Sequence, residues 1–134
     1  MEKVIIGSKD KFDFLGFTHI NGKTRKGYYK VIHKTSQKKM KTKKQNAKQW
    51  IKENIQREPT EIIKRLNVKL IGHYRYYGIT DNYNKLEEFR RYIIMTLFKQ
   101  LRGRGQKKKM SWEKYNKILK YNPIIQPRIY VAVS

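Results

Sequence analysis

The sequence predicts a mainly α protein, with an N-terminal β-hairpin followed by a three-helix bundle and a short C-terminal helix. Three long segments carry apolar residues at the three- and four-residue spacing of amphipathic helices. The N-terminal part instead alternates apolar and polar residues, which is typical of a half-buried strand. A chain of 134 residues is long enough for one domain with a modest core.

Residues 1–35 are predicted to form a lead and the hairpin. After the lead (1–11), residues 12–20 alternate with a period of about two, and Asn21-Gly22 is a hairpin-turn signal. Residues 28–33 are the predicted returning strand. We therefore expect a β-hairpin over residues 12–34.

The next unit, residues 36–102, is predicted to be the helical bundle. Ser36 can cap the first helix, and Pro59 suits the first turn of the second, where its missing N–H costs nothing. Asp81 and Asn82 are residues that favour the N-cap of the third. The expected helices span about 36–57, 59–77 and 83–102.

The last unit, residues 103–134, begins with a basic linker over residues 103–109. Ser111 can then cap a short helix that ends near Tyr121. Pro123 and Pro127 disfavour regular structure beyond it.

The charge of the chain predicts a polyanionic partner. It has 33 Lys and Arg against 10 Asp and Glu, a net charge of +23 at pH 7. Such a chain repels itself when compact, so nucleic acid is the first candidate partner. A membrane partner is not expected, because membrane surfaces usually attract one basic amphipathic helix and here every segment is basic. With no signal-peptide-like or membrane-spanning apolar run, we expect a protein that is not secreted.

The segment from Gly72 to Asn82 joins the second and third predicted helices and is rich in tyrosine. Helical spacing places Tyr74 and Tyr77 in the core. It leaves His73, Arg75 and Tyr76 as candidates for stacking and for phosphate or 2′-hydroxyl contacts. Gly72 within a helix costs about 1 kcal/mol relative to alanine; close helix packing is the favoured reason for it, and close approach of RNA is the alternative.

The first predicted helix has a lysine-rich face with almost no interleaved acid. Like charges one turn apart destabilise a helix, which favours phosphate binding over a merely solvated face. The loop cations can follow a phosphate backbone or simply confer solubility. The residues predicted to contact RNA are Lys38, Lys41, Lys44, Lys48, His73, Arg75, Tyr76, Arg90, Arg91, Arg104 and Lys107.

Catalytic chemistry and cofactors are not expected. Without cysteine there is no thiol nucleophile or thiolate zinc site. His19, His33 and His73 lack the carboxylate or thiolate support that a metal site needs. No serine or tyrosine has an evident base beside it.

The run Arg65-Leu66-Asn67 through Gly72-His73-Tyr74 to Asn82 resembles the signature of the thumb and maturase-specific region in group II intron-encoded reverse transcriptases. Residues 12–19 resemble the end of the last conserved reverse-transcriptase block, and residues 27–36 the hairpin that enters the thumb. Residues 110–115 with 127–129 resemble the downstream segment of bacterial members. The resemblance covers roughly residues 12–129.

The resemblance implies a module that grips structured group II intron RNA and assists splicing, in a bacterial cytoplasm or an organelle. The family's Asp-Asp polymerase motif and its Cys/His endonuclease ligands are not found in this sequence, so we expect no catalysis by this chain alone. One alternative is a thumb that works beside a separate palm-containing reverse-transcriptase chain. A second alternative is a basic protein that binds any nucleic acid.

Overall fold

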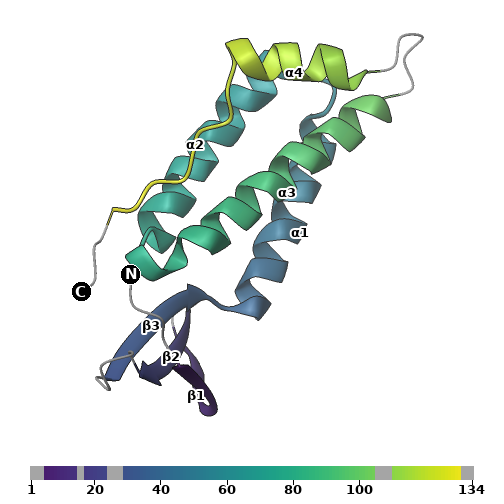
Figure 1. Cartoon of the computed structure of the whole chain (residues 1–134). Coiled ribbons are helices and arrows are strands. Elements are labelled where there is room, and N and C mark those ends of the chain that lie inside the picture. The colour runs from purple at the N-terminus through teal and green to yellow at the C-terminus, as the bar shows by residue number, and fades with distance from the viewer. Residues whose placement is uncertain (1–4, 15–16, 24–28, 105–109, 131–134) are drawn as a thin grey trace.

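The computed structural model describes residues 5–14, 17–23, 29–104 and 110–130 and confirms a mainly α protein (Figure 1). Its four α-helices are α1 (Gln37–Asn54), α2 (Pro59–Tyr77), α3 (Tyr83–Arg102) and α4 (Trp112–Tyr121). A 3₁₀ turn, η1 (Thr80–Asn82), joins α2 to α3. The first three helices run side by side, and α4 crosses one end of them (Figure 1).

The N-terminal part differs from the predicted hairpin. Strands β1 (Ile5–Phe14), β2 (Phe17–Lys23) and β3 (Tyr29–Thr35) pair antiparallel in the order β1-β2-β3. Strand β1 therefore begins within residues 1–11, which the sequence predicts only as a lead to the hairpin. Asn21 and Gly22 pair with Val31 and Lys30 inside β2 instead of forming the turn, because pairing on both sides of a central strand outweighs a local turn preference.

The predicted bounds of the second and third helices and two of the predicted caps are confirmed. The Ser36 hydroxyl accepts a hydrogen bond from Lys39 N, and the Ser111 hydroxyl accepts one from Lys114 N, both at 3.1 Å. Helix α2 starts at Pro59. Helix α1 ends at Asn54, a few residues earlier than expected. The predicted basic linker at residues 105–109 lies outside the described residues.

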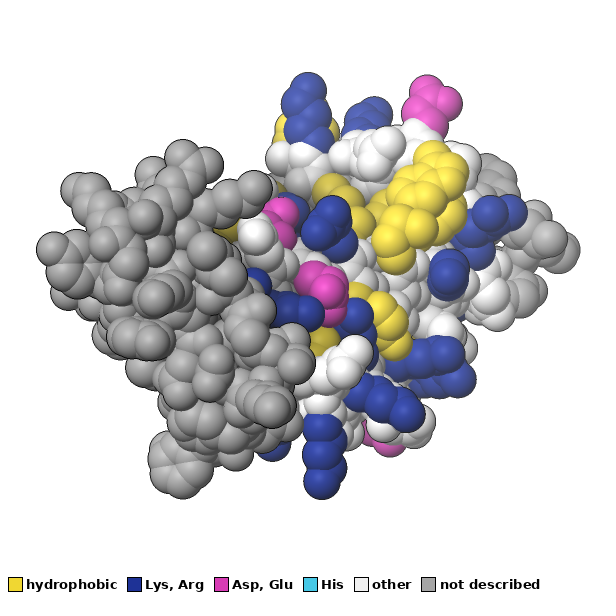
Figure 2. Space-filling model, turned by 60° about the horizontal axis from the view of Figure 1, so that its bottom comes forward, with side chains coloured by type: hydrophobic (Ala, Val, Ile, Leu, Met, Phe, Trp, Pro, Cys, Tyr) yellow, Lys and Arg dark blue, Asp and Glu magenta, His cyan; other side chains and the backbone are white. Residues whose placement is uncertain are grey.

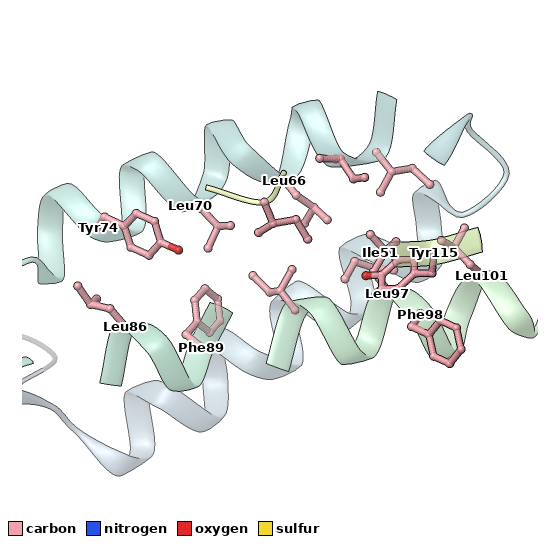
Figure 3. Close-up of a cluster of buried hydrophobic side chains, with 14 of the residues drawn as sticks. Ile51, Leu66, Leu70, Tyr74, Leu86, Phe89, Leu97, Phe98, Leu101 and Tyr115 are labelled. Carbon is pink, nitrogen blue, oxygen red and sulfur yellow. The ribbon is translucent and has the colours of Figure 1, made fainter. Parts of the chain in front are cut away.

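The core lies where α1, α2, α3 and α4 meet (Figure 3). Leu66, Leu70 and Tyr74 of α2 point toward Leu86 and Phe89 of α3 (Figure 3). Tyr74 and Tyr77 are buried, as their spacing predicts.

Helix α4 closes one end of this core through its aromatic residues. Tyr115 is buried, and its hydroxyl donates to the carbonyl of Ile94 at 2.7 Å. Trp112 stacks on Phe98 with ring centroids 3.7 Å apart. Stacked aromatic pairs stabilise by about 0.5–1.5 kcal/mol beyond the area they bury.

Residues 122–130, here called the C-terminal strap, run back along α2 (Figure 1). The side chain of Asn67 in α2 makes two hydrogen bonds to the strap. Its Nδ2 donates to the carbonyl of Pro123 at 3.0 Å, and its Oδ1 accepts from Ile125 N at 2.9 Å. Tyr74 donates to the carbonyl of Ile125 at 2.8 Å, and Tyr130 N donates to the carbonyl of Gly78. The strap is irregular, as its prolines predict, but these hydrogen bonds hold it against α2.

Asn82 joins the bundle to the end of the last strand. Its side chain is fully buried; its Oδ1 accepts from Thr35 N at 2.7 Å, and its Nδ2 donates to Thr35 Oγ1 and to the carbonyl of Tyr77. The prediction that its side chain caps the third helix is therefore wrong, since it makes no cap hydrogen bond to α3. Three hydrogen bonds to other elements satisfy the amide instead.

Candidate nucleic-acid interface

Exposed lysines cover the outward face of α1. Lys38, Lys41 and Lys48, all predicted contacts, are exposed. No acidic residue lies in the first turn of the helix. More basic than acidic side chains are visible on the face that Figure 2 presents. Among the described residues, Lys38, Lys41 and Lys48 form no ion pair, so this face of α1 can contact phosphates without first breaking one.

Lys44 lies on the same helix but differs from these three. Its ammonium group is 3.0 Å from Glu88 Oε2 and 5.4 Å from the centroid of the Tyr92 ring. Burial disfavours the charged form of Glu88, but the hydrogen bond from Lys44 and the charge of Lys85 outweigh it and lower the pKa of this carboxyl. Lys44 therefore neutralises an acidic residue of α3, and the RNA contact expected for it would require this ion pair to break.

Two of the predicted arginines bind backbone carbonyls. Arg90 donates through Nε and Nη2 to the carbonyl of Ile124, at 3.2 and 3.0 Å, and so fixes the strap. Arg104 donates to the carbonyls of Ile55 and Arg57, where α1 ends. A cation at a helix C-terminus satisfies free carbonyls and complements the helix dipole. Both side chains therefore have structural roles, and the phosphate contacts expected for them stay a prediction.

Three of the remaining predicted residues are exposed. Arg75 and Arg91 are exposed, and the Arg75 guanidinium lies 6.0 Å from the Tyr130 ring centroid. Tyr76 is 54% exposed. Lys107 lies outside the described residues.

His73 is buried, contrary to the expectation that it faces RNA. Its ring stacks on Phe89 with centroids 4.3 Å apart, and neither ring nitrogen has a hydrogen-bond partner. Burial, together with the nearby charge of Lys43, lowers the pKa of His73 to about 4, so the ring is neutral at pH 7. The described residues contain no group of His, Cys, Asp or Glu side chains that could hold a metal ion.

A groove of about 820 Å³ lies between α1 and α2, with α3 as its floor. Helix α1 contributes Lys39, Lys43 and Trp50, among others, and Phe89 and Ile93 of α3 form the floor. From α2 the groove is lined by Lys69, Leu70, Gly72, His73, Tyr76 and Tyr77. Apart from Tyr76, the prediction of contact residues missed the exposed groups of this groove.

Gly72 lies on this groove and is exposed. Apart from its own stretch of α2, a Cβ at this position would have no described part of the protein within 4 Å. The expectation that Gly72 permits close helix packing is therefore wrong. The alternative, an approach to its backbone from outside the chain, remains.

Helical spacing was the signal that could have found the groove. Lys39, Lys43 and Trp50 follow one another at intervals of four and seven residues, as do Lys69, Gly72 and Tyr76 at three and four. Each set therefore lies on one face of its helix. The sequence does not show that these two faces oppose each other, because that depends on how α1 and α2 pack on α3.

Comparison of the chain with protein-family models, with curated proteins and with solved structures finds no match. Among the described helices, none combines the length and apolarity needed to cross a membrane.

Proposed function

We propose that this chain is an RNA-binding module of the maturase type, which grips structured group II intron RNA through the α1 side of its helical bundle and so assists splicing. The observation that carries the proposal is the exposed basic face of α1, next to a cationic groove with aromatic walls. The resemblance of residues 12–129 to group II intron-encoded proteins supplies the class of RNA.

Electrostatics supports a polyanion as the partner. Each lysine that reaches a phosphate releases condensed counterions, which makes affinity fall steeply with salt. Lys38, Lys41 and Lys48 make no ion pair within the described part of the chain, so neutralising them removes no internal contact.

The test is a salt titration of binding to the intron RNA and to a scrambled RNA of equal length. The triple variant Lys38→Gln, Lys41→Gln, Lys48→Gln should reduce the slope of log affinity against log salt by roughly two to three. Its matched control removes the same charge from α4, at the exposed residues Lys114, Lys117 and Lys120. Equal slopes in the two triple variants would refute the assignment to α1, and equal affinity for both RNAs would refute the maturase assignment.

The alternative function is that of a reverse-transcriptase thumb, which acts only beside a separate palm-containing chain. Added palm-containing chain should then raise primer extension, whereas splicing assistance should need no such chain. Primer extension by this chain alone, with Mg²⁺ and nucleotides, would contradict the expectation that it has no polymerase activity.

A further inference from the structure

We propose that the groove between α1 and α2 holds one unpaired nucleobase of the bound RNA, with the flanking phosphates on its lysines. This inference rests on the proposed RNA-binding function and adds the element of RNA that the groove takes. It concerns residues that are separate from the outer lysine face of α1.

The size and shape of the groove suit a single nucleotide. Ligand sites of small molecules are typically about 300–1,000 Å³, and this groove measures about 820 Å³. A duplex cannot enter a space of this scale, because its bases are stacked and paired inside two backbones. An unpaired base can be turned out of the strand and placed on protein rings.

The walls provide surfaces on which a base can stack. Tyr76 is half-exposed in the groove, its ring packed edge-on against Tyr77 with centroids 4.6 Å apart. Trp50 is half-buried on the opposite wall, with the Lys69 ammonium 5.2 Å from its ring centroid. Stacking of a base on an aromatic side chain is worth about 1–3 kcal/mol by alanine substitution and works for every base.

The charge of the groove suits phosphate better than an acidic or apolar protein segment. Lys39 and Lys43 come from one wall and Lys69 from the other, and none of the described residues that line the groove is acidic. None of these three lysines forms an ion pair with a described carboxylate. The combination of rings in the middle and cations on both sides matches a base with phosphates on either side.

Gly72 gives the backbone of α2 an open approach at this point. A Cβ here would meet nothing within 4 Å outside its own stretch of helix, and Gly72 lines the groove, so we expect a larger side chain to extend into the groove. Gly72→Leu should therefore occupy part of the groove, and its Cβ meets no packed neighbour. Leucine also favours a helix over glycine, so the variant should stay folded.

The experiment measures Trp50 fluorescence in a Trp112→Phe background, which retains a ring on Phe98 and leaves Trp50 as the remaining tryptophan. The probes are a short oligoadenylate and a blunt RNA duplex of equal length. The oligoadenylate should quench Trp50, and the duplex should not. Gly72→Leu should abolish the quench and weaken oligoadenylate binding about tenfold, the loss expected for one stacked base.

Two controls separate the outcomes. Val68→Leu adds bulk on α2 at an exposed position outside the groove lining and should bind like the parent. Thermal melting monitored by circular dichroism verifies that Gly72→Leu is folded. Unchanged quench and affinity in folded Gly72→Leu, or equal quench by the duplex, would overturn the proposal, as would tighter binding of an acidic peptide at matched charge.

Failure of this proposal is distinguishable from failure of the proposed function. If Gly72→Leu binds oligoadenylate normally while the α1 triple variant still loses salt-dependent binding to intron RNA, the groove assignment is overturned and RNA binding stands. If the α1 triple variant changes nothing, the proposed function fails whatever the groove does.

Discussion

Substitution by alanine should change the free energy of unfolding in opposite directions at Gly72, within α2, and at Gly78, at its C-terminus. Gly78 is buried where the strap crosses the end of α2. A methyl group there would overlap the carbonyl oxygen of Tyr74 and lie 2.7 Å from that of Arg128. At Gly72 the same methyl group meets open space. Gly78→Ala should therefore destabilise the protein, and Gly72→Ala should stabilise it.

The magnitudes follow from these surroundings. Gly78 has φ −79°, which alanine adopts freely, so the cost is steric. Both close neighbours are backbone atoms that cannot rotate away, and such overpacking costs about 1–3 kcal/mol. Displacing the strap also weakens the 2.8 Å hydrogen bond from Tyr130 N to the Gly78 carbonyl, worth about 1 kcal/mol. We expect a loss of about 2–4 kcal/mol at Gly78 and a gain of about 0.5–1 kcal/mol at Gly72.

Urea denaturation followed by far-UV circular dichroism measures both changes. The free energy of unfolding is compared with that of the unmodified chain at equal ionic strength. If Gly78→Ala stays within about 0.5 kcal/mol of the parent, the range of an ordinary surface substitution, the strap does not contact Gly78 as described. A shift of both variants in the same direction would refute the contrast between a packed and an open glycine.

Three further substitutions test the buried polar groups. His73→Phe should raise stability at pH 7 by about 1 kcal/mol, because it removes two unpaired nitrogens. Burial lowers the folded-state pKa of His73 to about 4 from 6.5, so the unfolded chain binds more protons between these values. The parent should thus lose up to about 3 kcal/mol relative to His73→Phe as pH falls from 6.5 to 4; parallel pH profiles would contradict this. Asn82→Ala leaves Thr35 N without its partner and removes one of the two hydrogen bonds to the Tyr77 carbonyl, so it should cost about 1–3 kcal/mol, measured by urea denaturation. Asn67→Ala should cost about 1–3 kcal/mol and speed proteolysis after Tyr130, and unchanged cleavage would contradict its role in holding the strap.

The sequence predicts the helices well because their signals are local. Ser36, Pro59 and Ser111 mark helix starts through interactions within one turn. Tyr74 and Tyr77 are assigned to the core by spacing alone. Asn82 is misjudged because its amide reaches Thr35, 47 residues away, and no local pattern contains that distance.

The candidate interface is less predictable for the same reason. Lys38 and Lys44 look equivalent in the sequence, but Lys44 faces Glu88 across a helix pair. Arg104 looks like a mobile loop cation, yet it binds carbonyls 47 and 49 residues earlier in the chain. Charge counts predict that the chain binds a polyanion, whereas long-range packing decides which cations remain available for it.

The residues of the family-like run have mainly structural roles in this fold. The strap is hydrogen-bonded by the side chains of Asn67 and Tyr74 and by the carbonyl of Gly78. Asn82 joins the bundle to Thr35. Gly72 is the exception, since a glycine within a helix costs about 1 kcal/mol and no contact inside the described protein requires it. Glycine at position 72 therefore lowers the stability of α2 without allowing any contact inside the described protein. Its absent side chain instead leaves the groove open to a bound ligand, which is the role that the proposed nucleobase site gives it.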